Sequence, residues 1–123
     1  MDPVAVRFQP DAGPVVIQVR SGHTTLGRFR LSFEEDFEWI PIGDGDLSDE
    51  IPDVYIVPLS GEKLDDRFVL IVGNYASGGP LVQGEINVTY DITQQNAVIE
   101  TIPIREQRDG VHSAYHLLHF QAV

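Results

Sequence analysis

The sequence contains no cysteine and no long apolar run. Without cysteine, disulfide bonds, thiolate metal ligands and a cysteine nucleophile are excluded. The longest apolar run, from Phe68 to Val72, has the length of one strand, whereas a transmembrane helix needs about 18 or more apolar residues. Residues 1–4 carry neither the basic nor the apolar segment of a secretory signal. We therefore expect no integral membrane segment and a cytoplasmic location.

Basic side chains are also scarce, with 8 lysines and arginines against 19 acids and a net charge of −11. This balance argues against nucleic acid and anionic membrane surfaces as partners, because both are bound through a basic footprint. The acids are concentrated in residues 34–66, which carry twelve acids against Lys63 alone. Such blocks of like charge are typical of solvated segments that keep a protein soluble.

Motifs of the common catalytic and nucleotide-binding classes are missing as well. The chain has no Gly-x-Ser-x-Gly elbow, no P-loop, no His-Glu-x-x-His pair and no dinucleotide fingerprint. The glycine-rich segment 73–80 joins two strand-like segments and opens no helix. It is therefore typical of a hairpin loop and not of a phosphate site. These absences favour a non-enzymatic protein.

Strand patterns run along the whole chain, whereas the helical spacing of apolar residues is nearly absent. In residues 85–92, apolar side chains occupy every second position from Ile86 to Ile92. This alternation predicts a strand with one face on a core and the other in water. Residues 27–33 repeat the pattern. Further strands are expected at 4–8, 15–19, 39–42, 54–57, 68–72, 97–104 and 114–123.

Turn-forming residues separate these segments, and one turn is expected at residues 43–46. Pro41, Pro58 and Pro103 fall within strand-like segments. A proline cannot donate to a sheet ladder, so these positions are expected at edges, bulges or strand ends. The sequence thus predicts a single all-β domain over residues 1–123. Its fold is expected to be an antiparallel β-sandwich, jelly-roll or immunoglobulin-like/C2-like, of about eight strands with little or no helix.

Two of the expected strands, 54–57 and 68–72, are apolar at every position. Such a strand needs cover on both faces, whereas a two-layer sandwich covers only one face of each sheet. The second cover is either a loop of this chain (43–53 or 73–83) or another molecule, and a symmetric dimer is the simplest case of the latter. For the core, the strand faces predict burial of Phe29, Leu31, Leu70, Val72, Ile86 and Val88.

Residues 44–53 combine glycine with closely spaced carboxylates. Calcium binds about six to eight oxygen ligands, which a loop of this kind can supply. The spacing is not that of an EF-hand, because Asp49 stands where the loop needs glycine. A looser calcium site formed by Asp44, Asp46, Asp49 and Asp53 remains a hypothesis, beside the simpler interpretation of a solvated acidic loop. We expect no cofactor, apart from calcium if these carboxylates bind it.

Three of the four histidines lie close together in the sequence, at His112, His116 and His119. Imidazoles are good zinc ligands, and on a helix this spacing would place all three on one face. On a strand, His119 would face away from the other two, which prevents a three-histidine site within one element. An all-β chain favours the strand, so partly buried strand histidines are the simpler interpretation.

Three hypotheses for function follow from these patterns. The lead hypothesis is a non-enzymatic binding or assembly module that contacts a protein partner, or a second copy as a homodimer, through a sheet face or edge. The first alternative is a calcium-dependent module that binds a ligand or carbohydrate through its acidic loops. The second is a small histidine-metal enzyme. A stacking platform for a carbohydrate would consist of Trp39, Tyr55, Tyr75, Tyr90 and Tyr115, although core packing is the simpler role for these rings.

Overall fold

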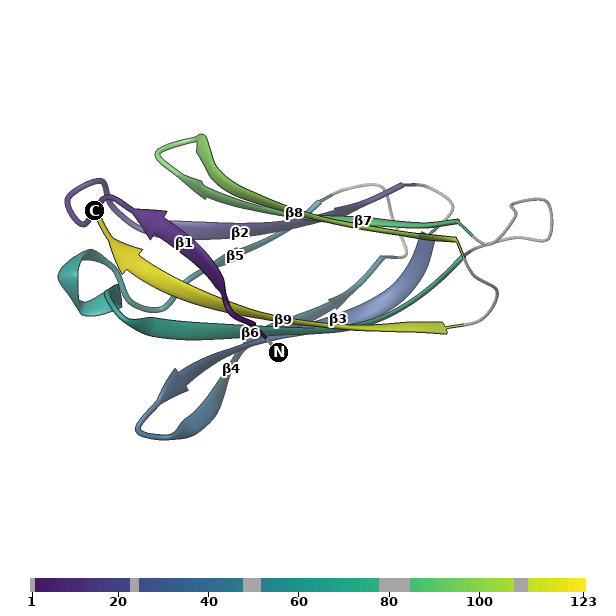
Figure 1. Cartoon of the computed structure of the whole chain (residues 1–123), viewed down its shortest axis with the longest axis horizontal. Coiled ribbons are helices and arrows are strands. Elements are labelled where there is room, and N and C mark those ends of the chain that lie inside the picture. The colour runs from purple at the N-terminus through teal and green to yellow at the C-terminus, as the bar shows by residue number, and fades with distance from the viewer. Residues whose placement is uncertain (1, 23–24, 48–51, 78–84, 108–110) are drawn as a thin grey trace.

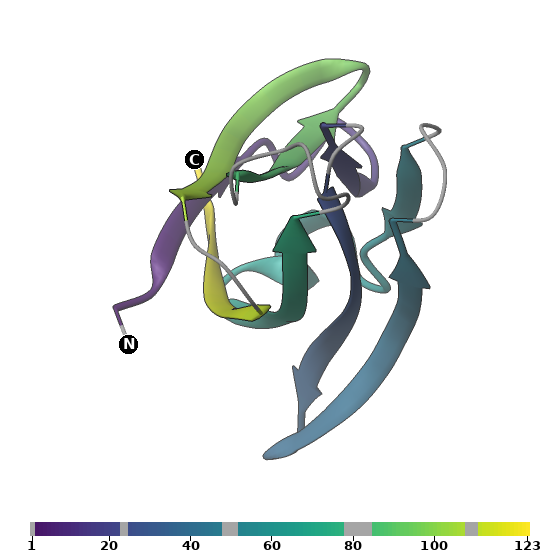
Figure 2. The ribbon, with the colours of Figure 1, turned by 90° about the vertical axis from the view of Figure 1, so that its right-hand side faces the viewer.

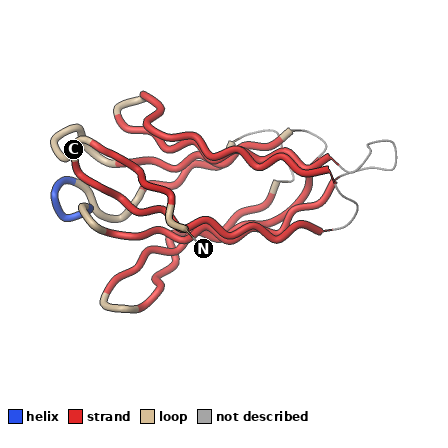
Figure 3. The backbone as a smooth tube through the Cα atoms, in the orientation of Figure 1, coloured by secondary structure: helices blue, strands red, loops and turns tan. Residues whose placement is uncertain are grey.

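The computed structural model describes residues 2–22, 25–47, 52–77, 85–107 and 111–123. Strand makes up most of these ranges, and the one helical segment is a short 3₁₀ turn (Figure 3). The elements are β1 (Val4–Phe8), β2 (Val15–Ser21), β3 (Thr25–Glu35), β4 (Glu38–Asp46), β5 (Asp53–Ile56), η1 (Gly61–Leu64), β6 (Arg67–Ser77), β7 (Glu85–Gln94), β8 (Ala97–Gln107) and β9 (Val111–Ala122). No helix in the described ranges has the length and apolar character to span a bilayer.

The strands form two sheets that pack face to face as a sandwich (Figure 1). One sheet has the order β1-β9-β6-β3-β4 and the other the order β5-β2-β7-β8. All neighbouring strands are antiparallel except β1 and β9, which run in the same direction. The predicted all-β sandwich is confirmed, and each of the nine segments expected from the sequence overlaps a strand.

The three prolines expected at edges, bulges or strand ends lie where a missing N–H group does not interrupt a ladder. Pro41 lies in β4 and Pro103 in β8, and these two strands are sheet edges. Pro58 follows the end of β5, which is also an edge strand. The register between β3 and β4 shifts beside Pro41, between Leu31 and Ser32. The expectation of edges, bulges and strand ends is confirmed.

Side chains from the inner faces of both sheets form one core. Phe29 and Leu31 of β3 and Ile86 and Val88 of β7 are buried, as their alternation with polar residues predicts. Each buried position is two residues from the next, which is the period of a pleated strand. The fully buried side chains come from both sheets, so the core holds the two layers together through the hydrophobic effect.

The predicted burial of Leu70 and Val72 is wrong, because the other set of alternate residues of β6 faces the core. Val69 and Ile71 are fully buried, whereas Leu70 and Val72 lie on the outer face and are only half-buried. A strand that is apolar at every position has no alternation to show which face is inside. The inner face is set instead by pairing with β3 and β9, whose own phases are unambiguous.

The end of the β3–β4 hairpin extends beyond the rest of its sheet. Pairing between β3 and β6 ends at Phe33↔Val69, whereas pairing between β3 and β4 continues to Glu35↔Glu38. The last residues of the hairpin therefore form a two-stranded ribbon beside the sandwich, visible as the blue arm in Figure 2. This ribbon projects from the body of the sandwich (Figure 1).

Candidate functional site

The acidic candidates for a calcium site lie in strands and not in the predicted loop. Asp44 and Asp46 belong to β4, and Asp53 is the first residue of β5. Asp49 lies outside the described residues. The prediction of a turn at residues 43–46 is therefore wrong, because these residues lie in β4. Carboxylates two residues apart on a strand are spaced along it by about 7 Å and do not converge by themselves.

Gly43 and Gly45 alternate with these aspartates along β4, and both face Tyr55 of β5. A Cβ atom at Gly43 would lie 2.6 Å from Cε1 of Tyr55, and one at Gly45 would lie 2.6 Å from the hydroxyl oxygen of the same ring. The ring of Tyr55 also packs edge-on against Phe29, with centroids 5.8 Å apart. Glycine is thus required here because Tyr55 leaves no room for a side chain, and not because the chain turns.

The aspartates of β4 point outward and stand opposite arginines of β3. In the register, Asp44 is paired with Arg30 and Asp46 with Arg28. Cross-strand pairs of opposite charge stabilise a sheet by about 0.2–1 kcal/mol each. The arginines also offset the negative charge of these carboxylates, which makes this part of the surface less favourable for a cation.

Asp53 brings a third carboxylate to this edge of the sandwich. Its Oδ2 atom would lie 3.1 Å from a Cβ atom at Gly45, so it stands beside the hydroxyl of Tyr55. Burial raises the pKa of Tyr55 above its usual 10.0, and the negative charge of Asp53 raises it further. The phenol is therefore neutral at physiological pH and can donate a hydrogen bond at this edge.

In the described ranges, no group of three or more histidine, aspartate or glutamate side chains is arranged to hold a metal ion. The calcium hypothesis includes Asp49, which lies outside those ranges. The four-aspartate site therefore stays a prediction. The described part of it consists of two aspartates that face arginines and a third at the start of β5, which belongs to the other sheet.

The three histidines of the zinc hypothesis lie on β9 and divide between its two faces. The partly buried His112 and His116 face inward, whereas His119 faces outward, as strand periodicity predicts. Nε2 of His112 is 4.0 Å from Oε1 of Glu106. Nε2 of His119 is 2.7 Å from Oδ1 of Asp66. The pleat thus separates His119 from the other two imidazoles, and the zinc hypothesis stays a prediction.

Two tyrosines of the inner face link the sheets beside His116. Tyr75 and Tyr90 are fully buried, and their hydroxyl oxygens are 2.5 Å apart. Burial raises the pKa of Tyr75 to about 12 and raises that of Tyr90 as well. The ring of His116 packs edge-on against Tyr90, and burial lowers the pKa of His116 below its usual 6.5. All three groups are neutral at physiological pH. Because Tyr75 and Tyr90 are fully buried, neither ring is accessible to a carbohydrate.

The two strands that are apolar at every position have different surroundings. On β5, Val54 and Ile56 are 59% and 62% exposed, so no described segment covers its outer face. On β6, the outer side chains are half-buried among those of neighbouring strands. Residues 43–46, which belong to one of the two loops considered as cover, lie in β4 at the sheet edge. Residues 48–51 and 78–83 of these loops lie outside the described ranges.

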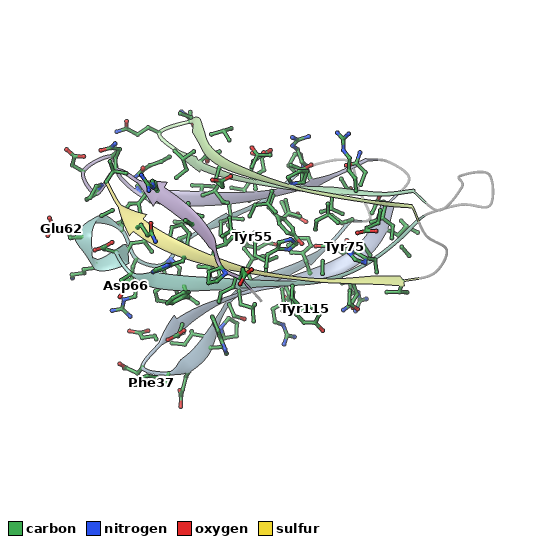
Figure 4. All side chains as sticks on the ribbon, in the orientation of Figure 1. Phe37, Tyr55, Glu62, Asp66, Tyr75 and Tyr115 are labelled. Atoms are coloured by element: carbon green, nitrogen blue, oxygen red, sulfur yellow. The ribbon has the colours of Figure 1, made fainter. Side chains whose placement is uncertain are left out.

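The outer face of the five-stranded sheet carries an apolar strip on two of its inner strands. Residues directly opposite in the register share a face, and β6 and β9 place Leu70 opposite Leu117 and Val72 opposite Tyr115. These four residues and Phe68, five in all, are called the apolar strip. Tyr115 is 53% exposed and lies on the side that faces away from the other sheet (Figure 4).

Polar contacts bound the apolar strip at both ends. At one end, the hydroxyl of Ser113 donates to Oδ1 of Asn74 at 2.7 Å. At the other, the ring of Phe68 stacks on the imidazole of His119, with centroids 4.4 Å apart and planes 9° from parallel. The hydrogen bond between His119 and Asp66, at 2.7 Å, fixes that imidazole. Polar groups therefore flank the strip at both ends.

An open groove of about 570 Å³ lies next to the strip, over β3 and β4. Its polar lining contains both signs of charge, from the two arginine–aspartate pairs described above, and Val72 joins it to the strip. On the far side of Ser32, the outer face continues to Pro41 and to Trp39, which is 45% exposed. Apolar and charged contacts are thus available side by side on one face.

The β3–β4 hairpin ends in a two-residue turn that the sequence patterns did not reveal. Asp36 and Phe37 form this turn, both with positive φ, and Glu35 is paired with Glu38 beside it. Phe37 is 99% exposed and points away from the sandwich (Figure 4). Hairpin turns are usually recognised by glycine or asparagine, and neither occurs here. The sequence signal for this turn was the short acidic segment 34–38 between the strand patterns at 27–33 and 39–42.

Comparisons of this chain with protein-family models, with curated proteins and with solved structures find no match. A β-sandwich hosts many unrelated functions, so the architecture alone assigns none. The functional argument therefore rests on the apolar strip, the groove beside it and the hairpin.

Proposed function

We propose that this chain is a non-enzymatic module that binds another protein through the outer face of its five-stranded sheet. The apolar strip is the observation that carries this proposal. Contiguous apolar patches surrounded by polar groups are typical of protein interfaces, whereas isolated exposed apolar residues are common everywhere. The strip joins five apolar side chains on adjacent strands, and the half-exposed ring of Tyr115 is a residue type enriched in such interfaces.

The groove supports the same proposal because it supplies the polar rim that an interface needs. Arg28 and Arg30 offer planar guanidinium donors, and the paired aspartates offer acceptors. Rim charges fix the orientation of a partner and its rate of association more than its affinity. Burial of the strip would supply most of the affinity through the hydrophobic effect.

Net charge favours a basic partner over a second copy of this chain. Each copy carries a net charge of −11, with most of the acids between residues 34 and 66, the segment that contains β4 and the hairpin tip. Two such chains repel each other, whereas a basic protein is attracted from a distance. A homodimer is thus the second outcome to test and not the favoured one.

The proposal is tested in two steps. A partner that contacts the strip is first identified, and its affinity is then measured for variants of the strip. The full chain is prepared with a photoreactive benzoylphenylalanine in place of Tyr115, and the protein that it labels in cells is purified and titrated against the unmodified chain. We expect Leu117→Thr and Tyr115→Thr to lower the affinity by about tenfold or more each, because threonine keeps the strand propensity but removes apolar contact. Val98→Thr is the matched control, since Val98 is 59% exposed on the other sheet.

Thermal melting of each variant separates lost contact from lost folding. Affinity that both strip variants leave unchanged, with their melting temperatures intact, would contradict the proposal. Light scattering over a hundredfold dilution tests the homodimer. If the chain forms a dimer that dissociates on dilution, and if Leu117→Thr weakens that dimer, the strip binds a second copy of this chain and not another protein.

A further inference from the structure

The tip of the β3–β4 hairpin combines three features that are each unfavourable in the isolated protein. The ring of Phe37 is 99% exposed, so it gains nothing from burial. Both turn residues have positive φ, 52° at Asp36 and 65° at Phe37. Glu35 and Glu38 are directly opposite each other in the register, and like charges in that position destabilise a hairpin. Stability alone therefore does not explain this sequence.

The backbone of the turn makes phenylalanine an unusual choice. Positive φ at both central residues defines a type I′ turn, for which Asp-Gly and Asn-Gly are the preferred pairs. Glycine suits the second position because it has no Cβ atom to meet the following carbonyl. A bulky residue in the left-handed region is uncommon, and such outliers cluster at functional sites. Phe37 thus occupies a position where glycine would be expected.

The hairpin holds this ring clear of the sandwich. Beyond the pair Phe33↔Val69, β3 has lost its β6 neighbour and only β4 accompanies it to the tip. Trp39 shares the outer face of the ribbon with Glu34, because these two residues are paired. The same face leads back through Ser32 toward the apolar strip, so the tip and the strip can contact one partner together.

We propose that Phe37 is an anchor that inserts into an apolar pocket on the partner, and that lysine or arginine side chains surround this pocket. The inference rests on the proposed function, that the chain binds a protein. Aromatic anchors in desolvated pockets carry much of the affinity of protein interfaces. Four carboxylates, from Glu34, Glu35, Asp36 and Glu38, surround the ring in the sequence and are complementary to a basic rim. The short turn orders the backbone that carries the ring before binding, which lowers the entropy cost of association.

The same carboxylates argue against a bilayer as the target of Phe37. Aromatic side chains on projecting loops also suit the membrane interface, where basic neighbours add attraction to anionic lipids. Here all charged neighbours from Glu34 to Glu38 are acidic. Their charge would repel an anionic surface and attract a basic protein. A protein pocket is therefore the favoured site for the ring.

The test uses the full chain with benzoylphenylalanine in place of Phe37, irradiated in the cells that produce it. A control chain carries the same group at Val98, which is exposed on the opposite sheet. The protein labelled from position 37 and not from position 98 is purified and titrated against unmodified chain. We expect Phe37→Ala to lower the affinity by about tenfold or more and Val98→Ala to change it by less than about twofold. Glu35→Gln combined with Glu38→Gln should lower the affinity less and flatten its dependence on salt.

Equal labelling from positions 37 and 98 would overturn the anchor, as would an unchanged affinity in Phe37→Ala. Labelling of lipid, or of a second copy of the chain, would overturn it in favour of a membrane contact or of self-association. The two proposals fail separately. If Leu117→Thr abolishes binding and Phe37→Ala does not, the sheet face stands without the anchor. If the reverse holds, the anchor stands without the sheet face.

Discussion

Replacing Phe37 by glycine should make the protein more stable, although it removes a large aromatic side chain. The ring is 99% exposed, so its loss removes no buried surface. At φ 65°, the backbone of residue 37 lies in the left-handed region. There, a residue with a Cβ atom costs about 1–2 kcal/mol relative to glycine. The substitution also creates Asp-Gly, one of the preferred pairs of a type I′ turn.

The expected gain is smaller than this relief, because glycine also increases the entropy of the unfolded chain. That effect costs about 0.5–1 kcal/mol. The net stabilisation should therefore be about 0.5–1 kcal/mol. For a domain of this size, such a gain raises the melting temperature by about 2–5 °C.

Calorimetry or denaturant titration of three variants distinguishes the backbone from the ring. Phe37→Ala removes the ring but keeps a Cβ atom at positive φ, so its stability should stay within about 0.5 kcal/mol of the original. Asn96→Gly tests the second turn with this geometry, in the β7–β8 hairpin, where Gln95 and Asn96 have φ of 51° and 61°. Asparagine tolerates the left-handed region, so a change of only a few tenths of a kcal/mol is expected. If Phe37→Gly is no more stable than Phe37→Ala, the strain argument is refuted.

Three further predictions concern the core, the buried histidine and the metal hypotheses. Leu31→Ala should lower the free energy of unfolding by about 2–5 kcal/mol, because Leu31 is fully buried; a loss below about 0.5 kcal/mol, as expected for a surface site, would contradict the strand phase. Burial lowers the pKa of His116 below 6.5, so the unfolded chain takes up a proton that the folded chain resists, and stability should fall as the pH drops through 6.5. Denaturant titrations at pH 7.5 and 5.5 should show a smaller loss of stability in His116→Gln than in the original chain, and an equal loss would mean that other groups cause it. Calcium at millimolar concentration should leave the melting temperature unchanged, since Asp44 and Asp46 face arginines; a rise that Asp44→Ala with Asp46→Ala abolishes would establish the calcium site.

The strands of this fold can be predicted from the sequence wherever apolar and polar residues alternate. Residues 27–33 and 85–92 alternate strictly, and both their location and their inner faces are as predicted. Residues 68–72 are apolar throughout, so the pattern locates the strand but not its inner face. That face depends on register with neighbouring strands, which is a property of the whole sheet.

The candidate site was harder to predict because its residues depend on contacts between distant segments. Gly43 and Gly45 are typical of a turn, yet they lie in a strand. Glycine is needed at both positions because the ring of Tyr55, in the other sheet, leaves no room for a Cβ atom. Phe37 was missed because turn propensities favour glycine and asparagine at its position. The division of the β9 histidines between two faces was predictable, since the pleat alone determines it.

The parallel pairing of β1 and β9 places the first and last strands side by side, both running in the same direction. A pull on their outer ends in opposite directions would therefore load this pair in shear. The register pairs from Val4↔Leu118 to Phe8↔Ala122 would resist together, whereas the pairs of a hairpin separate one at a time. Forced unfolding depends on the height of the unfolding barrier and not on equilibrium stability. The sandwich should thus resist tension along the line that joins these two strands more strongly than its thermal stability alone would indicate.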